Sequence, residues 1–304
     1  MTLKAEASDF LGRFREIVSD PLNLLIDRVV EAGQVNNGFV TLHNGHQVAV
    51  SGQFAYYDGF SDILIINRGV HEPLEEYVFQ QLMKVVSPQP SMIELGAYWG
   101  HYSMWLKKAR PSAKTVLVQA EEDNLAVGRA NFDKNGYEGE FICAFVGKGQ
   151  FAIDPFFQER GLSGLDILHS DIQGSELEML DDAVNALGTH QITYVFISTH
   201  SQAIHLSVVS KLRRFGYRIE VSSDFDSETT SYDGLVFASS PRVQPLFADF
   251  VRIPTKAPCC NGMMPPWWFG LAGVSIIGAW AVVWSSFHLQ FFGDLVGRVA
   301  SFRH

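Results

Sequence analysis

Two kinds of apolar pattern alternate between residue 91 and about residue 240: short continuous runs, and segments with apolar residues at helical spacing. Short apolar runs are typical of buried strands, and in chain order they are MIEL, TVLVQA, FICAF, LDILHS, ITYVFIS, YRIEV and GLVFA. Segments with apolar residues at helical spacing separate them, near 99–109, 124–135, 175–187 and 203–215. Strands that alternate with helices predict an α/β fold, with a mostly parallel sheet covered on both faces.

The N-terminal part of the chain shows a different pattern. Apolar positions within 5–32 follow helical spacing, and residues 72–86 predict an amphipathic helix that Pro73 opens near its first turn. Between them, FVTLH and HQVAV flank the dipeptide Asn44-Gly45, which favours a tight type I′ turn. This part of the chain therefore predicts a β-hairpin set among helices.

The C-terminal part is strongly apolar. No charged residue occurs over 257–293, and 267–287 is almost wholly apolar with tryptophans near both ends. As a helix, this stretch would be roughly 31 Å long, close to the thickness of a hydrocarbon core. We predict a membrane-associated helix over 267–287. A buried helix or hairpin stays open as an alternative, because glycines and serines interrupt the run.

These patterns divide the chain into three parts. We expect a helical and hairpin extension over 1–88, a ligand-binding α/β domain over 89–245, and a linker with the hydrophobic helix over 246–304. The formal net charge of −10 argues against a nucleic-acid partner, which would need a clustered basic surface. The three cysteines do not form a disulfide framework, and MTLKAEASDFLGRF has no secretory signal pattern. We expect a cytoplasmic protein, attached to the cytoplasmic face of a membrane if the last helix inserts.

A glycine motif follows the first strand of the α/β pattern. MIELGAYWGHYS contains Glu94, Gly96 and Gly100 in the spacing E-x-G-x-x-x-G, where glycines allow a sharp turn and a close backbone approach to a ligand. The dinucleotide fingerprint G-x-G-x-x-G is absent, and the spacing matches the S-adenosylmethionine loop. Glu121 ends the next strand, 25 residues after Gly96, where a carboxylate can bind ribose hydroxyls. The neighbouring acids of the EED run, and simple turn chemistry at the glycines, are the alternatives.

Together these motifs make the stretch from about 65 to 240 resemble the FkbM-type S-adenosylmethionine-dependent methyltransferases. The matching pieces, in the family's order, are ELGAYWGHYS, AEED, RANFDKN, LDILHSDIQGSELEML, VFISTHSQAIH and LRRFGYRI. The resemblance implies a doubly wound, seven-stranded sheet of the Rossmann-like class I methyltransferase type. It also implies S-adenosylmethionine as cofactor and O-methylation of a sugar or natural-product hydroxyl. If the hydrophobic tail holds the protein at a membrane, a glycolipid is a further candidate acceptor. The chain departs from the family pattern at His169 and Gln173, where Lys and Glu are frequent, and in its hydrophobic tail.

Two residues at later strand ends are candidates for the chemistry. Methyl transfer is an in-line displacement, so the acceptor oxygen has to be positioned and its proton removed. Asp171 follows LDILHS and His200 follows ITYVFIS, so both lie at the carboxyl ends of strands, where α/β sheets bind ligands. We predict both as catalytic, with His200 as a general base and Asp171 orienting it or binding the acceptor hydroxyl.

Other polar residues in this region have simpler explanations. Ser175 and Glu178 form the pattern of a capping box for the next helix, so Glu178 is expected to be structural. Glu176 stays undecided, since an acid in the first turn of a helix is favoured by the dipole whatever the function. Together with His205 and the two predicted catalytic residues, Glu176 would also suit a metal ion. No spacing indicates that these four converge, and we predict no metal site.

Histidines elsewhere give weaker indications. His43 and His46 flank the hairpin turn and are expected on the surface, while His101, just after the glycine motif, is either a cofactor or substrate contact or a helix-surface residue. The leading hypothesis is an S-adenosylmethionine-dependent O-methyltransferase. The alternative is a non-catalytic, cofactor-binding or assembly protein that its C-terminal hydrophobic segment anchors.

Overall fold

The computed structural model describes residues 7–56, 61–147, 149–226 and 233–247. The chain divides into two units, 1–256 and 257–304, and every described residue belongs to the first. The predicted membrane-associated helix over 267–287 lies outside the described residues. Within the described ranges, no helix is both long and apolar enough to cross a bilayer.

A seven-stranded sheet forms the centre of the described part. Its strand order is β6-β5-β4-β7-β8-β10-β9, and every neighbouring pair is parallel except those that β10 makes with β8 and β9. Each of the seven apolar runs became one strand, so the predicted α/β fold with a mostly parallel sheet is confirmed. The strands are β4 (Ser91–Leu95), β5 (Lys114–Gln119), β6 (Glu140–Cys143), β7 (Leu165–Ser170), β8 (Ile192–Thr199), β9 (Arg218–Ser223) and β10 (Gly234–Ser239).

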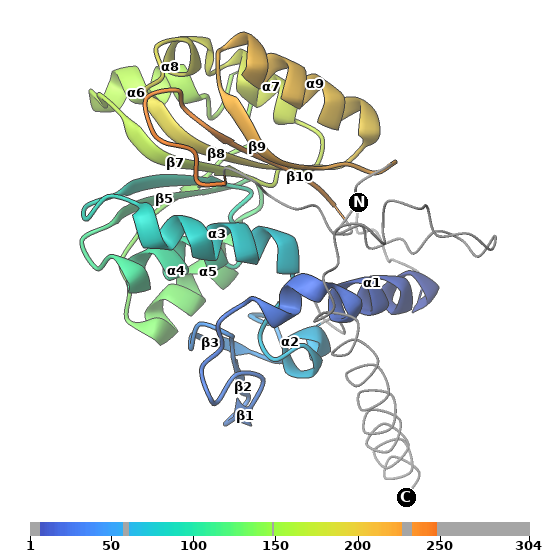
Figure 1. Ribbon diagram of the computed structural model, residues 1–304. Helices are drawn as coiled ribbons and strands as arrows, with labels where there is room; N and C mark the ends of the chain where they lie inside the picture. The colour runs from blue at the N-terminus through green and yellow to red at the C-terminus, as the bar shows by residue number, and fades with distance from the viewer. Residues whose placement is uncertain (1–6, 57–60, 148, 227–232, 248–304) are drawn as a thin grey trace, which may run out of the picture. The chain divides into compact units, whose positions relative to one another are not determined.

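Helices cover both faces of this sheet (Figure 1). One face carries α6, α7, α8 and α9, and the other carries α3, α4 and α5. The predicted helices are present, except that the 175–187 segment is split in two, and α6 was not predicted. Their bounds are α3 (Pro73–Val85), α4 (His101–Ala109), α5 (Glu122–Asn135), α6 (Ile153–Arg160), α7 (Glu176–Asp181), α8 (Val184–Gly188) and α9 (Gln202–Arg214).

The N-terminal extension contains the predicted hairpin. The helical pattern over 5–32 is interrupted early, because Asp20 accepts a hydrogen bond from the Leu22 backbone N–H and Pro21 opens a short 3-10 helix. The hairpin turn is not type I′, which needs positive φ at two residues, since Gly45 (φ +88°) has positive φ and Asn44 does not. The elements are α1 (Ala7–Ser19), η1 (Pro21–Leu24), β1 (Val35–Asn36), β2 (Phe39–Thr41), β3 (Gln47–Ala49) and α2 (Asp62–Ile66).

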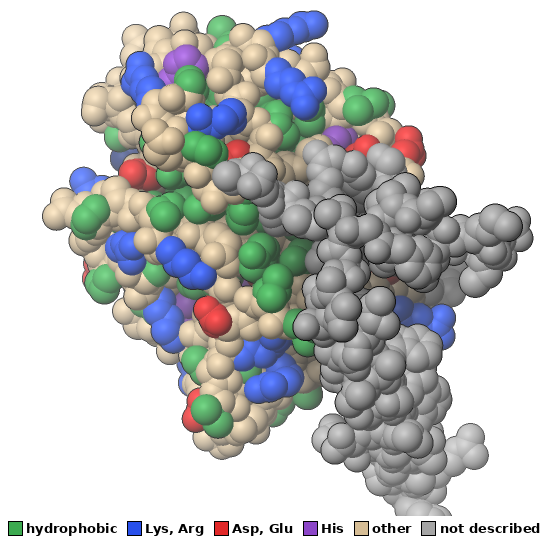
Figure 2. Space-filling view, in the orientation of Figure 1, with side chains coloured by type: hydrophobic (Ala, Val, Ile, Leu, Met, Phe, Trp, Pro, Cys, Tyr) green, Lys and Arg blue, Asp and Glu red, His purple; other side chains and the backbone are tan. Residues whose placement is uncertain are grey.

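The hairpin packs onto the α/β part through a shared apolar core. Val40, Leu42 and Val48 are fully buried in the same cluster as Met104 of α4 and Phe132 of α5. Burying these side chains in a common core holds the N-terminal extension on α4 and α5. The glycine motif lies directly before α4. Lys and Arg side chains are dispersed, with no continuous basic stripe among the described residues on the face seen in Figure 2.

Candidate active site

The glycine motif forms a tight loop between β4 and α4. Gly96 and Gly100 have φ values of +71° and +72°, a region that favours glycine because a side chain there meets the backbone. The backbone N–H groups of Gly96 and Ala97 donate to the Val118 carbonyl of β5 at 2.9 and 3.1 Å. The loop therefore lies at the carboxyl ends of β4 and β5, where a nucleoside ligand of such a sheet binds.

Glu94 supports this loop from beneath. Its side chain is buried, and its Oε2 accepts a hydrogen bond from the Ser103 backbone N–H at 2.9 Å. Burial raises the pKa of Glu94, against the lowering effects of nearby His169 and of the hydrogen bonds from Ser103. The observed contact fixes the first turn of α4. A direct contact between Glu94 and the cofactor stays a prediction.

Glu121 lies where the ribose-binding acid was expected. It lies two residues after the end of β5, precedes the first residue of α5 and is exposed, with Oε2 accepting a hydrogen bond from Asn124 Nδ2 at 3.1 Å. Glu122 and Asp123 belong to α5 itself, so Glu121 is the acid at the strand end. Binding of the cofactor ribose by Glu121 stays a prediction.

The structure brings Asp171 and His200 together, and it adds Glu176. His200 Nε2 lies 3.1 Å from Asp171 Oδ1, and His200 Nδ1 lies 2.7 Å from Glu176 Oε1. The strands that precede them, β7 and β8, are parallel neighbours, so both strand ends meet at one edge of the sheet. The Asp171 side chain is 37% exposed whereas that of Glu176 is fully buried, so Asp171 is the carboxylate that a ligand can reach.

The charge of His200 differs from the predicted one. Burial lowers the pKa of His200, but its contacts with the acceptor oxygens of Asp171 and Glu176 outweigh this effect and raise the pKa to about 10. Burial raises the pKa of Glu176, but the hydrogen bond with His200 and backbone hydrogen bonds outweigh this effect and lower it. His200 therefore holds its proton at neutral pH, which disfavours the predicted general-base role in this arrangement.

Asp171 is in direct contact with the glycine loop. Its backbone N–H donates to the Leu95 carbonyl at 2.9 Å, which continues the pairing of β4 with β7. A Cβ on Gly96 would lie 1.8 Å from the Asp171 carbonyl oxygen, so only glycine fits at that position. The predicted cofactor loop and the predicted acceptor residue are therefore adjacent.

The first turn of α7 differs from the predicted capping box. The Ser175 side chain makes no capping hydrogen bond, whereas the Gly174 backbone N–H donates to Glu176 Oε1 at 3.1 Å. Glu176 thus binds its own turn and His200 at once, which the sequence could not decide. His205 is outside this group, because its ring nitrogens contact the hydroxyls of Thr199 and Ser222, each at 2.9 Å.

The histidines of the hairpin are buried, which contradicts the prediction that they lie on the surface. His43 and His46 are 1% and 2% exposed, because the hairpin packs face-on against α4 and α5. His101 is 1% exposed and stacks on the Trp99 ring, with centroids 4.9 Å apart, so it is not a helix-surface residue. A contact of His101 with cofactor or substrate stays a prediction.

His169, where the chain departs from the family pattern, has a buried partner. Its Nε2 lies 2.5 Å from Glu75 Oε1 of α3, and Ser198 Oγ donates to Glu75 Oε2 at 2.9 Å. Burial lowers the pKa of His169, but Glu75 outweighs this and raises it. The helical pattern of 72–86 gave no sign that Glu75 faces inward.

Comparison with protein families identifies the class. Residues 72–219 match the family described as Methyltransferase FkbM domain. The chain therefore contains an FkbM methyltransferase domain, as the motifs predicted, and is an S-adenosylmethionine-dependent methyltransferase by family. S-adenosylmethionine is the cofactor that this family implies. The comparison with curated proteins gives no match.

Solved structures similar to this chain are distant in sequence. M. capricolum TrmK, in a complex with S-adenosylhomocysteine, is 15% identical, with 54% of this chain and 68% of that chain covered and a TM-score of 0.36. A precorrin-6y C5,15-methyltransferase from Geobacter metallireducens is 14% identical, with 54% and 86% covered and a TM-score of 0.40. The METTL16 methyltransferase domain is 11% identical, with 55% and 68% covered and a TM-score of 0.42. At these scores the likeness carries no argument about function.

Proposed function

We propose that this protein transfers the methyl group of S-adenosylmethionine to a hydroxyl oxygen on a saccharide, glycolipid or natural product. The observation that carries the proposal is the contact between the glycine loop and Asp171, where a Cβ on Gly96 would meet the Asp171 carbonyl. It supports an acceptor site directly beside the cofactor site. Such adjacency is what an in-line displacement between two bound molecules needs.

The cofactor would be held at the carboxyl ends of β4 and β5. Gly96 and Gly100 allow the backbone to approach the ligand, and the exposed Glu121 carboxylate can accept hydrogen bonds from ribose hydroxyls. Glu94 would act through the loop, since its carboxylate holds the Ser103 N–H of α4. When bound, S-adenosylmethionine supplies an electrophilic methyl group on a sulfonium.

We propose that Asp171 binds the acceptor hydroxyl and acts as the general base. Its partly exposed carboxylate can accept a hydrogen bond from the acceptor hydroxyl and take the proton as the oxygen attacks. His200 is protonated at neutral pH, so it would position Asp171 and balance its charge, while Glu176 fixes His200 from the buried side. This assignment revises the predicted base from His200 to Asp171 and keeps both residues in the site.

An acceptor screen with isotope-labelled cofactor tests this function. The purified full-length chain is incubated with a panel of saccharides, glycolipids and hydroxylated natural products, and mass spectrometry detects the labelled methyl group on oxygen. We expect turnover with a hydroxyl acceptor, and a loss of about 100-fold or more in kcat for Asp171→Asn, since general-base contributions are of this order.

Asp181→Asn is the matched control. Asp181 is an exposed acid ten residues after Asp171 in the chain. Its Oδ1 pairs with Lys211 Nζ at 2.5 Å, so it is outside the site. We expect it to retain wild-type turnover. Methyl transfer to nitrogen or carbon only would contradict the O-methylation proposal. Cofactor binding without turnover on any acceptor would favour the non-catalytic, assembly-protein alternative.

A further inference from the structure

Three buried side chains with metal-binding atoms meet beside the loop, and they come from three separate elements. His43 lies in the turn between β2 and β3, Glu76 lies on α3, and His101 is the first residue of α4. His43 Nε2 lies 3.0 Å from Glu76 Oε2, and His101 Nε2 lies 4.0 Å from Glu76 Oε1. One ligand atom from each residue can be chosen so that all three lie within 4.8 Å of one another.

Several of these atoms lack hydrogen-bond partners. His101 is 1% exposed, and neither of its ring nitrogens has a hydrogen-bond partner. His43 Nε2 and Glu76 Oε2 contact each other at 3.0 Å as an ion pair, although their geometry does not suit a hydrogen bond. Leaving a buried polar group unsatisfied costs about 1–3 kcal/mol, and a metal ion bound at His101 would remove that cost.

Outer contacts hold these side chains in place. His43 Nδ1 lies 3.4 Å from the Asp27 carbonyl oxygen, which directs the lone pair of Nε2 towards the other two residues. Glu76 Oε1 accepts backbone hydrogen bonds from His71 and Glu72 at 2.8 and 3.2 Å, and His71 Nδ1 lies 2.5 Å from the same oxygen. Such second-layer contacts are typical of metal ligands.

We propose that His43, Glu76 and His101 bind one divalent transition-metal ion, with Zn²⁺ the best match, as a structural centre. Two imidazoles and a carboxylate are a ligand set that Zn²⁺ uses, with bonds of about 2.0–2.2 Å and a water molecule as the fourth ligand. In a tetrahedral site, ligand atoms then lie about 3.4 Å apart. The observed separations of 3.0 and 4.0 Å lie on either side of that value but involve different oxygens of Glu76, and the three ligand atoms lie within 4.8 Å of one another. Binding would therefore require the side chains to rotate so that all three ligand atoms converge on the ion.

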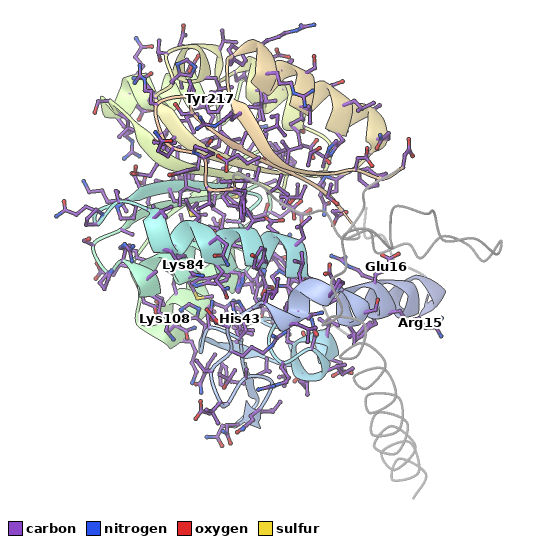
Figure 3. The ribbon with its side chains drawn as sticks, in the orientation of Figure 1. Arg15, Glu16, His43, Lys84, Lys108 and Tyr217 are labelled. Carbon is purple, nitrogen blue, oxygen red and sulfur yellow. The ribbon has the colours of Figure 1, made fainter. Side chains whose placement is uncertain are left out.

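The position of this centre gives it a role. It joins the N-terminal hairpin to α3 and α4, and Figure 3 shows the labelled His43 at this junction. His101 follows Gly100 directly, so an ion there would also stiffen the loop that we expect to hold the cofactor. The three side chains are buried and Asp171 is not among them, so the ion would act by stabilising the fold. This proposal does not depend on the acceptor or on O-methylation.

Metal analysis of the full-length chain tests the proposal. The protein, prepared without a polyhistidine tag, is analysed by inductively coupled plasma mass spectrometry, then stripped with a chelator and titrated with Zn²⁺ while thermal unfolding is followed. We expect about one ion per chain, a lower melting temperature after stripping, and recovery of that temperature on adding Zn²⁺. His101→Gln should weaken Zn²⁺ binding by more than the roughly 10–100-fold that outer-layer changes cost.

His46→Gln is the matched control, because His46 is a buried histidine of the same hairpin whose Nε2 instead contacts Tyr137 OH at 3.0 Å. It should keep the metal and the Zn²⁺-dependent rise in melting temperature. Wild-type protein that contains no metal and shows no change in melting temperature with Zn²⁺ would overturn the proposal. Equal metal content in His101→Gln and wild-type protein would overturn it as well.

Discussion

His200 lies between two carboxylates, which hold its proton at neutral pH. Asp171 and Glu176 contact its two ring nitrogens at 3.1 and 2.7 Å. The positions of Asp171 and His200 at the ends of two consecutive strands were predictable, because the apolar runs show where each strand lies along the chain. The sequence could not show that Glu176 turns back to His200, since that depends on the conformation of one turn.

The His200→Gln variant tests this ion network through stability. The pKa of His200 is about 10 in the folded protein and about 6.5 unfolded, so the folded state binds the proton more tightly. Its contribution is therefore complete below about pH 6.5 and is lost as pH rises towards 10. We expect His200→Gln to lower the free energy of unfolding by about 2 kcal/mol near pH 6 and by much less near pH 10.

Urea unfolding at a series of pH values measures this difference. His190→Gln is the control, because His190 Nε2 contacts the Phe215 carbonyl at 2.7 Å rather than a pair of acids. A difference between wild type and His200→Gln that is the same across this pH range would show that the paired charges do not hold His200 in its protonated form.

The glycine loop is the element on which both predicted subsites depend. Its position was predictable, since E-x-G-x-x-x-G follows an apolar run and precedes a helical one. Its contact with Asp171 was not, because the parallel pairing of β4 with β7 joins residues far apart in the chain. The burial of His43 and Glu76 was missed for the same reason, since neither turn chemistry nor a helical period says which partner covers a residue.

Gly96→Ala tests the loop. The new Cβ would overlap the Asp171 carbonyl at 1.8 Å, and φ of +71° disfavours any side chain. We expect a loss of at least about 3 kcal/mol in the free energy of unfolding, or loss of S-adenosylmethionine binding in protein that still folds. Gly161→Ala is the control, since it has φ of +60° but no atom within 4 Å of its Cβ. It should cost only about 1 kcal/mol.

Gly96→Ala and Gly161→Ala can be compared by chemical unfolding and by calorimetric titration with the cofactor. Equal effects of the two substitutions on stability and on binding would contradict the prediction, because they would show that the close approach of Gly96 to Asp171 matters for neither.

At the scale of the whole molecule, the described residues account for the methyltransferase domain and its N-terminal extension. The predicted membrane-associated helix over 267–287 stays a prediction, because it lies outside the described residues. We expect a chain that ends at residue 256 to move from the membrane to the soluble fraction of cells that express it. Full-length protein that is recovered without detergent in the soluble fraction would contradict membrane association.

Binding of S-adenosylmethionine is the central claim, because the interpretation of the glycine loop and of Glu121 depends on it. Isothermal titration of the full-length protein with S-adenosylmethionine, at two temperatures so that a zero enthalpy at one cannot hide binding, measures it most directly. The account predicts saturable binding of about one cofactor per chain, with weaker binding by Glu121→Gln because ribose hydrogen bonds to a carboxylate are lost. No binding heat at either temperature, from protein that unfolds cooperatively, would contradict it.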